Sequence, residues 1–73
     1  MMTLPPPAAV DVRDMLCAQA LALVARSAKQ LSAGRALVIR YNAADVKRDL
    51  LVWARDRGHR IEAAGAETLR LTR

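Results

Sequence analysis

The spacing of hydrophobic residues changes repeatedly along this 73-residue chain, and these changes limit the folds it can adopt. In Ala8–Val12 the two valines lie two positions apart, on one face of a short strand. From residue 18 apolar residues recur every three or four positions, which predicts a helix that Gly34 ends. Arg35–Tyr41 then has three consecutive apolar residues with charges only near its borders, which indicates a buried strand.

The second half repeats this alternation and adds a hairpin. Asn42 is placed to cap a second helix, whose apolar positions continue at helical spacing up to Gly58. Two strand segments flank Gly65, and in the second of them Leu69 and Leu71 alternate with polar residues. The sequence therefore predicts an α+β domain, a βαβαββ two-layer sandwich with two helices packed on one face of a four-stranded mixed sheet.

Length and composition further restrict the possible core, domain organisation and location of the protein. With no Phe, one Trp and one Tyr, the core of this single domain must be aliphatic. Residues 1–7, which include three prolines, are expected to form a flexible tail before a domain over residues 8–73. The longest apolar stretch, Ala20–Ala25, is too short to span a membrane, and the opening residues do not have the pattern of a secretory leader. We therefore expect a soluble, cytoplasmic monomer.

The distribution of charged residues indicates that the second half of the chain binds partners. The net charge is +5; Met1–Gly34 holds three basic and two acidic residues, whereas Arg35–Arg73 holds nine and five. A basic second half favours acidic partners, and Arg48, Arg55 and Arg57 are candidate partner-binding residues, although part of this charge pairs within the helix. One Cys and one His provide neither an internal disulfide nor a metal site, so no metal and no cofactor are expected.

Cys17 is the candidate for chemistry because it lies at or just before the first residue of the predicted first helix. The unpaired N–H groups and the helix dipole at such a position favour a thiolate and lower the thiol pKa below its reference of about 8.5. Arg13 could support this effect, whereas Asp14 could oppose it. In the alternative interpretation, Cys17 is a small hydrophobic residue that seats the helix.

Several motifs together resemble the TusA (SirA-like) sulfur-carrier family over residues 8–73. They are Asp11–Ala20, a helix closing at Leu31–Gly34, the pair Asp49-Leu50 with Trp53, and Gly58-His59. The family has an approach loop Asp-x-Arg-Gly-x-x-Cys-Pro-x-Pro and the same βαβαββ order. The resemblance implies that Cys17 is the catalytic residue of a sulfurtransferase-type carrier. Cys17 would accept a sulfane sulfur from a cysteine desulfurase or rhodanese-like protein, hold it as a persulfide and deliver it to an acceptor protein.

The chain departs from the family pattern around this cysteine. Ala18 and Ala20 replace both prolines of the Cys-Pro-x-Pro motif, and Asp14 replaces its glycine. Ala44 stands where a helix-starting Pro is common, and Leu51 stands within the family's Asp-Ile-Pro. Ala18 gives up the preorganised helix start that Pro provides, and Asp14 introduces strain if its φ is positive. A second hypothesis is therefore a non-catalytic TusA-like interaction or regulatory module that has lost persulfide transfer.

A third hypothesis is an RNA-binding domain, because the sandwich also resembles the ribosome-binding domain of a translation initiation factor. The strands offer no set of aromatic residues for base stacking, so direct nucleic-acid binding is not expected. We expect Trp53 to have a packing role, in the core or half-covered, rather than to serve as a binding platform. His59 is expected to be exposed beside the helix-ending Gly58. The sulfur donor, the acceptor and the pathway (transfer-RNA thiolation, molybdenum-cofactor maturation or sulfur oxidation) stay open.

Overall fold

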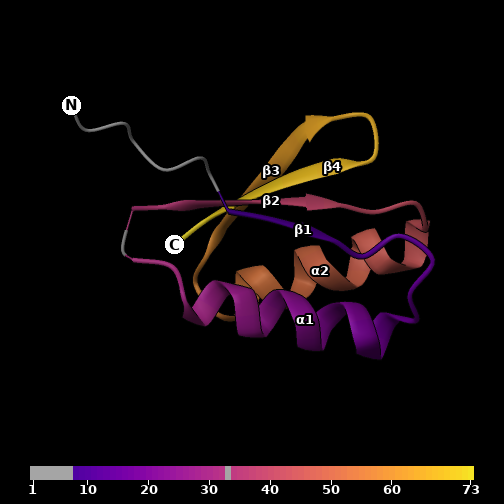
Figure 1. The fold of residues 1–73 in the computed structure, drawn as a ribbon, viewed down its shortest axis with the longest axis horizontal. Helices are drawn as coiled ribbons and strands as arrows, with labels where there is room; N and C mark the ends of the chain where they lie inside the picture. Colours follow the sequence, from indigo (N-terminus) through magenta and orange to yellow (C-terminus); the bar gives the residue numbers. More distant parts are fainter. Residues whose placement is uncertain (1–7, 33) are drawn as a thin grey trace.

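A computed structural model describes residues 8–32 and 34–73, and the predicted order of elements is confirmed. The elements are β1 (Ala8–Asp11), α1 (Cys17–Lys29), β2 (Ala36–Arg40), α2 (Ala44–Asp56), β3 (Arg60–Gly65) and β4 (Thr68–Thr72). The sheet order is β1-β2-β4-β3; β1 is parallel to β2, and the other neighbours are antiparallel. Both helices cover the same face of the sheet, which gives the predicted two-layer α+β sandwich (Figure 1).

The predicted N-terminal tail, residues 1–7, lies outside the described residues. In the part of the chain that the structure describes, no helix has both the length and the apolar character needed to cross a membrane.

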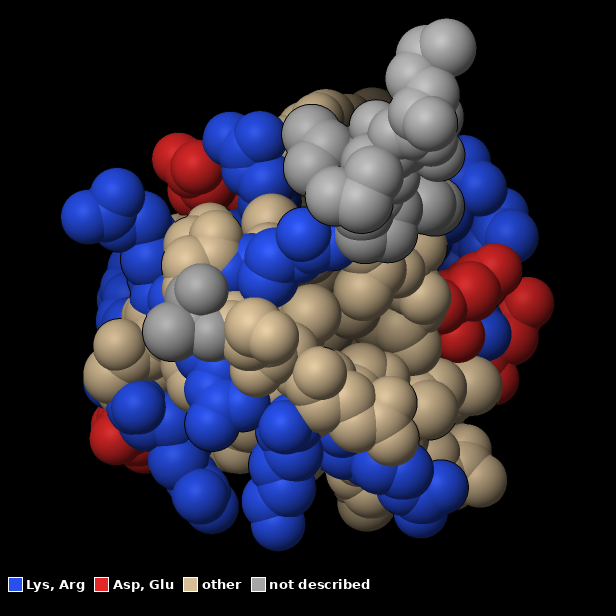
Figure 2. Space-filling view, turned by 60° about the vertical axis from the view of Figure 1, so that its left-hand side comes forward, with Lys and Arg blue, Asp and Glu red and all other residues tan. Residues whose placement is uncertain are grey.

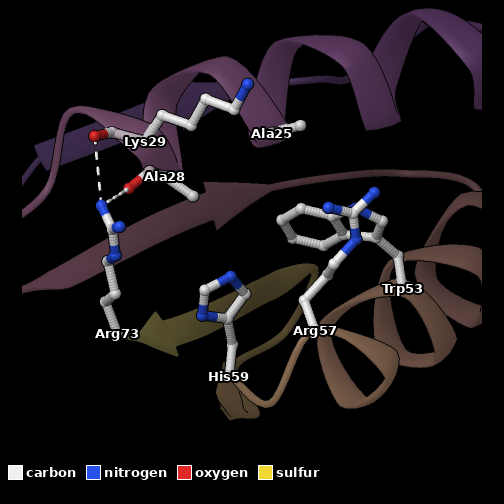
Figure 3. A pocket seen from close by; sticks show the side chains of 7 residues that line it. All are labelled: Ala25, Ala28, Lys29, Trp53, Arg57, His59 and Arg73. Carbon is white, nitrogen blue, oxygen red and sulfur yellow. Dashed lines mark hydrogen bonds between the residues drawn. The ribbon is translucent and has the colours of Figure 1, made fainter.

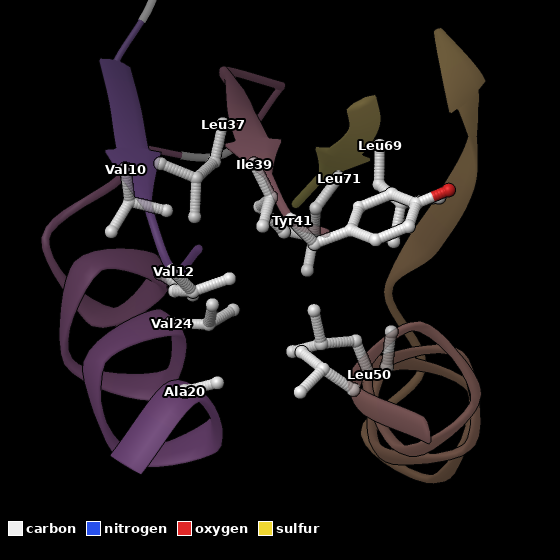
Figure 4. Close-up of a cluster of buried hydrophobic side chains, with 13 residues drawn as sticks. Val10, Val12, Ala20, Val24, Leu37, Ile39, Tyr41, Leu50, Leu69 and Leu71 are labelled. Carbon is white, nitrogen blue, oxygen red and sulfur yellow. The ribbon is translucent and has the colours of Figure 1, made fainter. Parts of the chain in front are cut away.

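Aliphatic side chains from both layers form the core, and the strand period selects them. In the register of β2 with β4, Leu37 lies opposite Leu71. Ile39 lies opposite Leu69 two positions further along. Because alternate residues of a strand point to the same face, all four side chains are buried against the helices, where Leu50 of α2 meets them (Figure 4). The helices are therefore fixed on the sheet by a small, wholly aliphatic contact at its centre.

Helix α1 ends at Lys29, so the prediction that it continues to Gly34 was wrong. After Lys29 the backbone N–H groups bond three residues back, Gln30 to Ser27 and Leu31 to Ala28, which tightens the last turn and ends the α-helix. Nη1 of Arg73, from the other end of the chain, donates hydrogen bonds to the carbonyl oxygens of Ala28 (3.0 Å), Lys29 (3.1 Å) and Leu31 (2.8 Å) and so covers this end of α1. Gly34, with a φ of 84°, instead forms the turn before β2, where its N–H donates to the carbonyl of Arg73.

Asn42 does not cap α2, contrary to the prediction. The residue at the N-cap position is Ala43, and no side chain caps the helix. Asn42 joins two loops instead: its Oδ1 accepts a hydrogen bond from the backbone N–H of Asp14 (3.0 Å), and its Nδ2 donates to Oδ1 of Asp14 (2.8 Å). Asp14 has the positive φ, 63°, at which a side chain introduces strain. The two hydrogen bonds hold this conformation and so fix the loop that leads to Cys17.

Candidate functional site

Cys17 is the first residue of α1, as predicted, and lies at the boundary between core and solvent. The helix starts here because Leu16 has extended backbone angles, and its N–H donates a hydrogen bond to Oε1 of Gln19 (3.2 Å). The side chain of Cys17 is half-buried and packs against the core, whereas that of Leu16 is 72% exposed. The thiol is thus within reach of a protein that docks over the start of α1.

The thiol faces two carboxylates of α2, which changes its chemistry. Sγ of Cys17 donates a hydrogen bond to Oδ2 of Asp45 at 3.5 Å, and Asp49 lies one helical turn further along α2. Hydrogen bonding to Asp49 contributes most to a raised thiol pKa, followed by partial desolvation and by Asp45. Together they raise the pKa of Cys17 from an ordinary 9.0 to about 11.

The prediction of a lowered thiol pKa was therefore wrong. The dipole of α1 contributes only partial charges, whereas Asp45 and Asp49 place full negative charges beside the sulfur. With its pKa raised to about 11, the thiol of Cys17 is almost entirely protonated at pH 7. The isolated protein holds Cys17 as a neutral thiol.

Two of the residues that were predicted to support the thiol, Arg13 and Asp14, are engaged by other side chains. Arg13 folds back onto Asp11, with Nη2 2.6 Å from Oδ2 and Nε 2.9 Å from Oδ1. Asp14 is occupied by Asn42. Neither Arg13 nor Asp14 contributes to the raised thiol pKa, and Ala18 is exposed in the first turn of α1 with no polar group to offer.

Asp45 and Asp49 are the site residues that reasoning from sequence missed. A signal for them existed, because β1 and β2 are parallel neighbours and the helix that follows each strand starts at the same edge of the sheet. The first turns of α1 and α2 therefore lie side by side in any such fold. A carboxylate in the first or second turn of α2 is brought to a cysteine in the first turn of α1.

The pairing of Asp11 with Arg13 gives an expected dependence on pH. The side-chain hydrogen bond from Arg13, followed by its backbone hydrogen bond, lowers the pKa of Asp11 from 3.8 to about 2. Because the folded-state pKa is the lower one, the pair stabilises the fold above about pH 4, and this contribution is lost as the pH falls toward 2. Urea unfolding at successive pH values should show a shallower loss of stability in this window for Asp11→Asn than for the wild type. The difference will be small because both side chains are about half exposed. Equal slopes for the two proteins would contradict the pairing.

The three arginines that were predicted to bind partners are spread along α2 and its C-cap. Arg48 lies in the first half of α2, with Nε 3.7 Å from Oδ1 of Asp49. Arg55 and Arg57 lie at the other end of α2, roughly 9–18 Å of helix away from Asp45 and Asp49, which face the thiol. Only Arg48 therefore accompanies the thiol, and a partner-binding role for the three stays a prediction.

Among residues 8–32 and 34–73 there is no cluster of three His, Cys, Asp or Glu side chains that could hold a metal ion.

Comparisons of the chain with protein-family models, with curated proteins and with solved structures give no match. The βαβαββ order and the mixed four-stranded sheet are consistent with the topology of the TusA-like fold.

Proposed function

We propose that the chain is a TusA-like sulfur carrier that holds a persulfide on Cys17 and passes the sulfur to an acceptor protein. The juxtaposition of Cys17 with the carboxylates of α2 carries this proposal. Sγ of Cys17 donates a hydrogen bond to Oδ2 of Asp45, and Asp49, which belongs to a second motif of the resemblance, lies one helical turn further along α2. A purely structural cysteine would not require an open position beside the exposed Leu16.

The chemistry is a thiol exchange that consumes no oxidant or reductant. The Cys17 thiolate attacks the terminal sulfur of a persulfide on a cysteine desulfurase or a rhodanese-like protein. The sulfur–sulfur bond of the donor breaks while a new one forms on Cys17, and the departing donor thiolate takes up the proton that Cys17 lost. The same exchange, with Cys17 as the donor, delivers the sulfur to the acceptor. Because the chain has a single cysteine, no internal thiol competes for the cargo.

The raised pKa of Cys17 supports a mechanism in which the partner activates the thiol. A donor surface that places Lys or Arg side chains against Asp45 and Asp49 would offset their negative charge and lower the thiol pKa in the docked complex. The exposed Leu16 supplies an apolar contact at the same place. In this mechanism the free carrier is protected from side reactions and becomes reactive only on docking.

The non-catalytic interaction module is the second candidate, and the neutral state of the thiol favours it. In this function the hydrogen bond from Cys17 to Asp45 joins the first turns of α1 and α2, and Leu16 provides the contact with a partner. Cys17→Ala would then leave partner binding unchanged.

Intact mass spectrometry separates the two functions. The protein is incubated with a cysteine desulfurase and cysteine, and separately with a rhodanese and thiosulfate. The carrier is expected to gain one sulfur atom that a reducing agent removes, and Cys17→Ser is expected to gain none. A wild-type protein that stays unmodified with both donors, at pH 9 as well as at pH 7, would contradict the carrier function and leave the interaction module.

A further inference from the structure

A pocket of about 250 Å³ lies where the two helices end, at the opposite end of the helical layer from Cys17. Its walls come from three parts of the chain: the last turns of α1, the end of α2 with the turn that follows it, and the C-terminal residue (Figure 3). The residues that matter for its chemistry are Ala25, Ala28, Lys29, Trp53, Arg57 and His59.

The inner part of the pocket suits a flat ring. Trp53 and His59 form one wall, with ring centroids 5.5 Å apart and planes tilted by 42°. The facing wall, from α1, consists of the small side chains of Ala25 and Ala28, which leave the space open. Trp53 is half-buried and packs against the core, as predicted, and it also lines this pocket.

The rim of the pocket is cationic. Lys29 and Arg57 are exposed at its edge, and none of the residues that line it is acidic. Figure 2 shows this end of the molecule, with Lys and Arg side chains around an uncharged area and the visible carboxylates toward the margin. Helix C-termini would ordinarily repel an anion. At α1 the guanidinium of Arg73 donates to the last carbonyls, and at α2 the carbonyls of Ala54 and Arg55 accept the N–H groups of His59 and Gly58.

We propose that this pocket binds a nucleotide, with the base against Trp53 and His59 and the phosphate between Lys29 and Arg57. Aromatic side chains stack on bases of any sequence, and an arginine fork matches the geometry of a phosphate. The volume is slightly below the range of about 300–1,000 Å³ that is usual for drug-sized ligands, which limits the site to one nucleotide unit. This unit can be a free nucleoside monophosphate or the end of an RNA strand. The site uses no sulfur chemistry and goes beyond the proposed carrier function.

The chain contains one tryptophan, so the fluorescence of Trp53 reports directly on the pocket. Titration of the full chain with adenosine monophosphate is expected to give saturable quenching. The Kd should be at least about tenfold lower than for adenosine or for inorganic phosphate, because each of these probes fills only half of the site. Equilibrium dialysis with labelled adenosine monophosphate provides a second measurement that does not depend on quenching. Cys17→Ser should bind the nucleotide like the wild type, which separates this test from that of the carrier function.

Two exposed arginines provide a matched pair of variants. Arg57→Ala, which removes a residue from the rim, is expected to raise the Kd about tenfold. Arg55→Ala removes the same charge two residues earlier, outside the pocket, and should change the Kd by less than about twofold. Equal losses for the two variants would overturn the proposal, because binding would then reflect diffuse charge.

Titrations with further ligands show whether the bound nucleotide is free or is the end of an RNA strand. The end of an RNA strand is indicated if an adenine hexaribonucleotide binds much more tightly than the monophosphate and if its affinity falls equally in Arg57→Ala. Equal affinities point to the free nucleotide. Inorganic phosphate that binds as well as adenosine monophosphate, or a hexaglutamate peptide that displaces the nucleotide at lower concentration, would overturn the assignment.

Discussion

Replacing Asp45 and Asp49 together by asparagine is expected to shift the ionisation midpoint of Cys17 from about 11 toward its ordinary value of 9.0. Asparagine keeps nearly the same shape and can still accept a hydrogen bond, but it carries no charge that opposes the thiolate. Asp45→Asn alone and Asp49→Asn alone should each lower the pKa of Cys17, because both carboxylates raise it.

The rate of alkylation by iodoacetamide as a function of pH measures this shift. A pKa lower by two units raises the thiolate fraction at neutral pH about a hundredfold, but the less basic thiolate is also a weaker nucleophile. With the usual dependence of nucleophilicity on pKa, the net gain in rate at pH 7 is about tenfold.

Asp56→Asn is the matched control, because it removes the same charge from the last residue of the same helix. It should leave both the midpoint and the rate unchanged. If the double variant kept the wild-type midpoint, the carboxylates would not hold the thiol neutral, and partner-dependent activation of the carrier would lose its basis.

The layered fold could be predicted from the sequence because local patterns determine it. Leu69 and Leu71 alternate with polar residues in β4 and are both buried. Gly58 directly follows the capping residue of α2 and has a φ of 76°, in the left-handed region that favours glycine at a helix end. Each of these features depends on residues within a few positions along the chain.

The features that sequence reasoning missed depend on contacts between distant residues. Arg73 covers the carbonyls at the end of α1, which ends earlier than its apolar pattern suggests, and Asn42 hydrogen-bonds to the loop at Asp14 instead of capping α2. The candidate site likewise combines a local feature, which was predicted, with a contact between distant residues, which was missed. The position of Cys17 at the start of α1 is local and was predicted correctly. The direction of its pKa shift was wrong because the opposing charges belong to α2.

Leu50→Ala is expected to lower the free energy of unfolding by about 2–5 kcal/mol, the usual cost when a buried leucine is truncated. Leu50 is fully buried, with 0% of its surface exposed, and it is the side chain of α2 that meets the leucines of β4. A chain of 73 residues has about 4–11 kcal/mol of stability in total. The variant should therefore lose about half of its stability, which urea unfolding followed by circular dichroism will show as a lower midpoint.

Val52→Ala provides the comparison, because it truncates a side chain of the same helix that is 52% exposed. Its stability should stay within about 0.5 kcal/mol of the wild type. Similar losses for the two variants would mean that α2 is not anchored on the sheet through Leu50.

The anchoring of α2 also affects the thiol, since Asp49 precedes Leu50 and takes its position from the same turn of α2. In urea concentrations that unfold Leu50→Ala but not the wild type, Cys17 of the variant should therefore ionise near 9.0 while the wild-type thiol keeps its raised pKa.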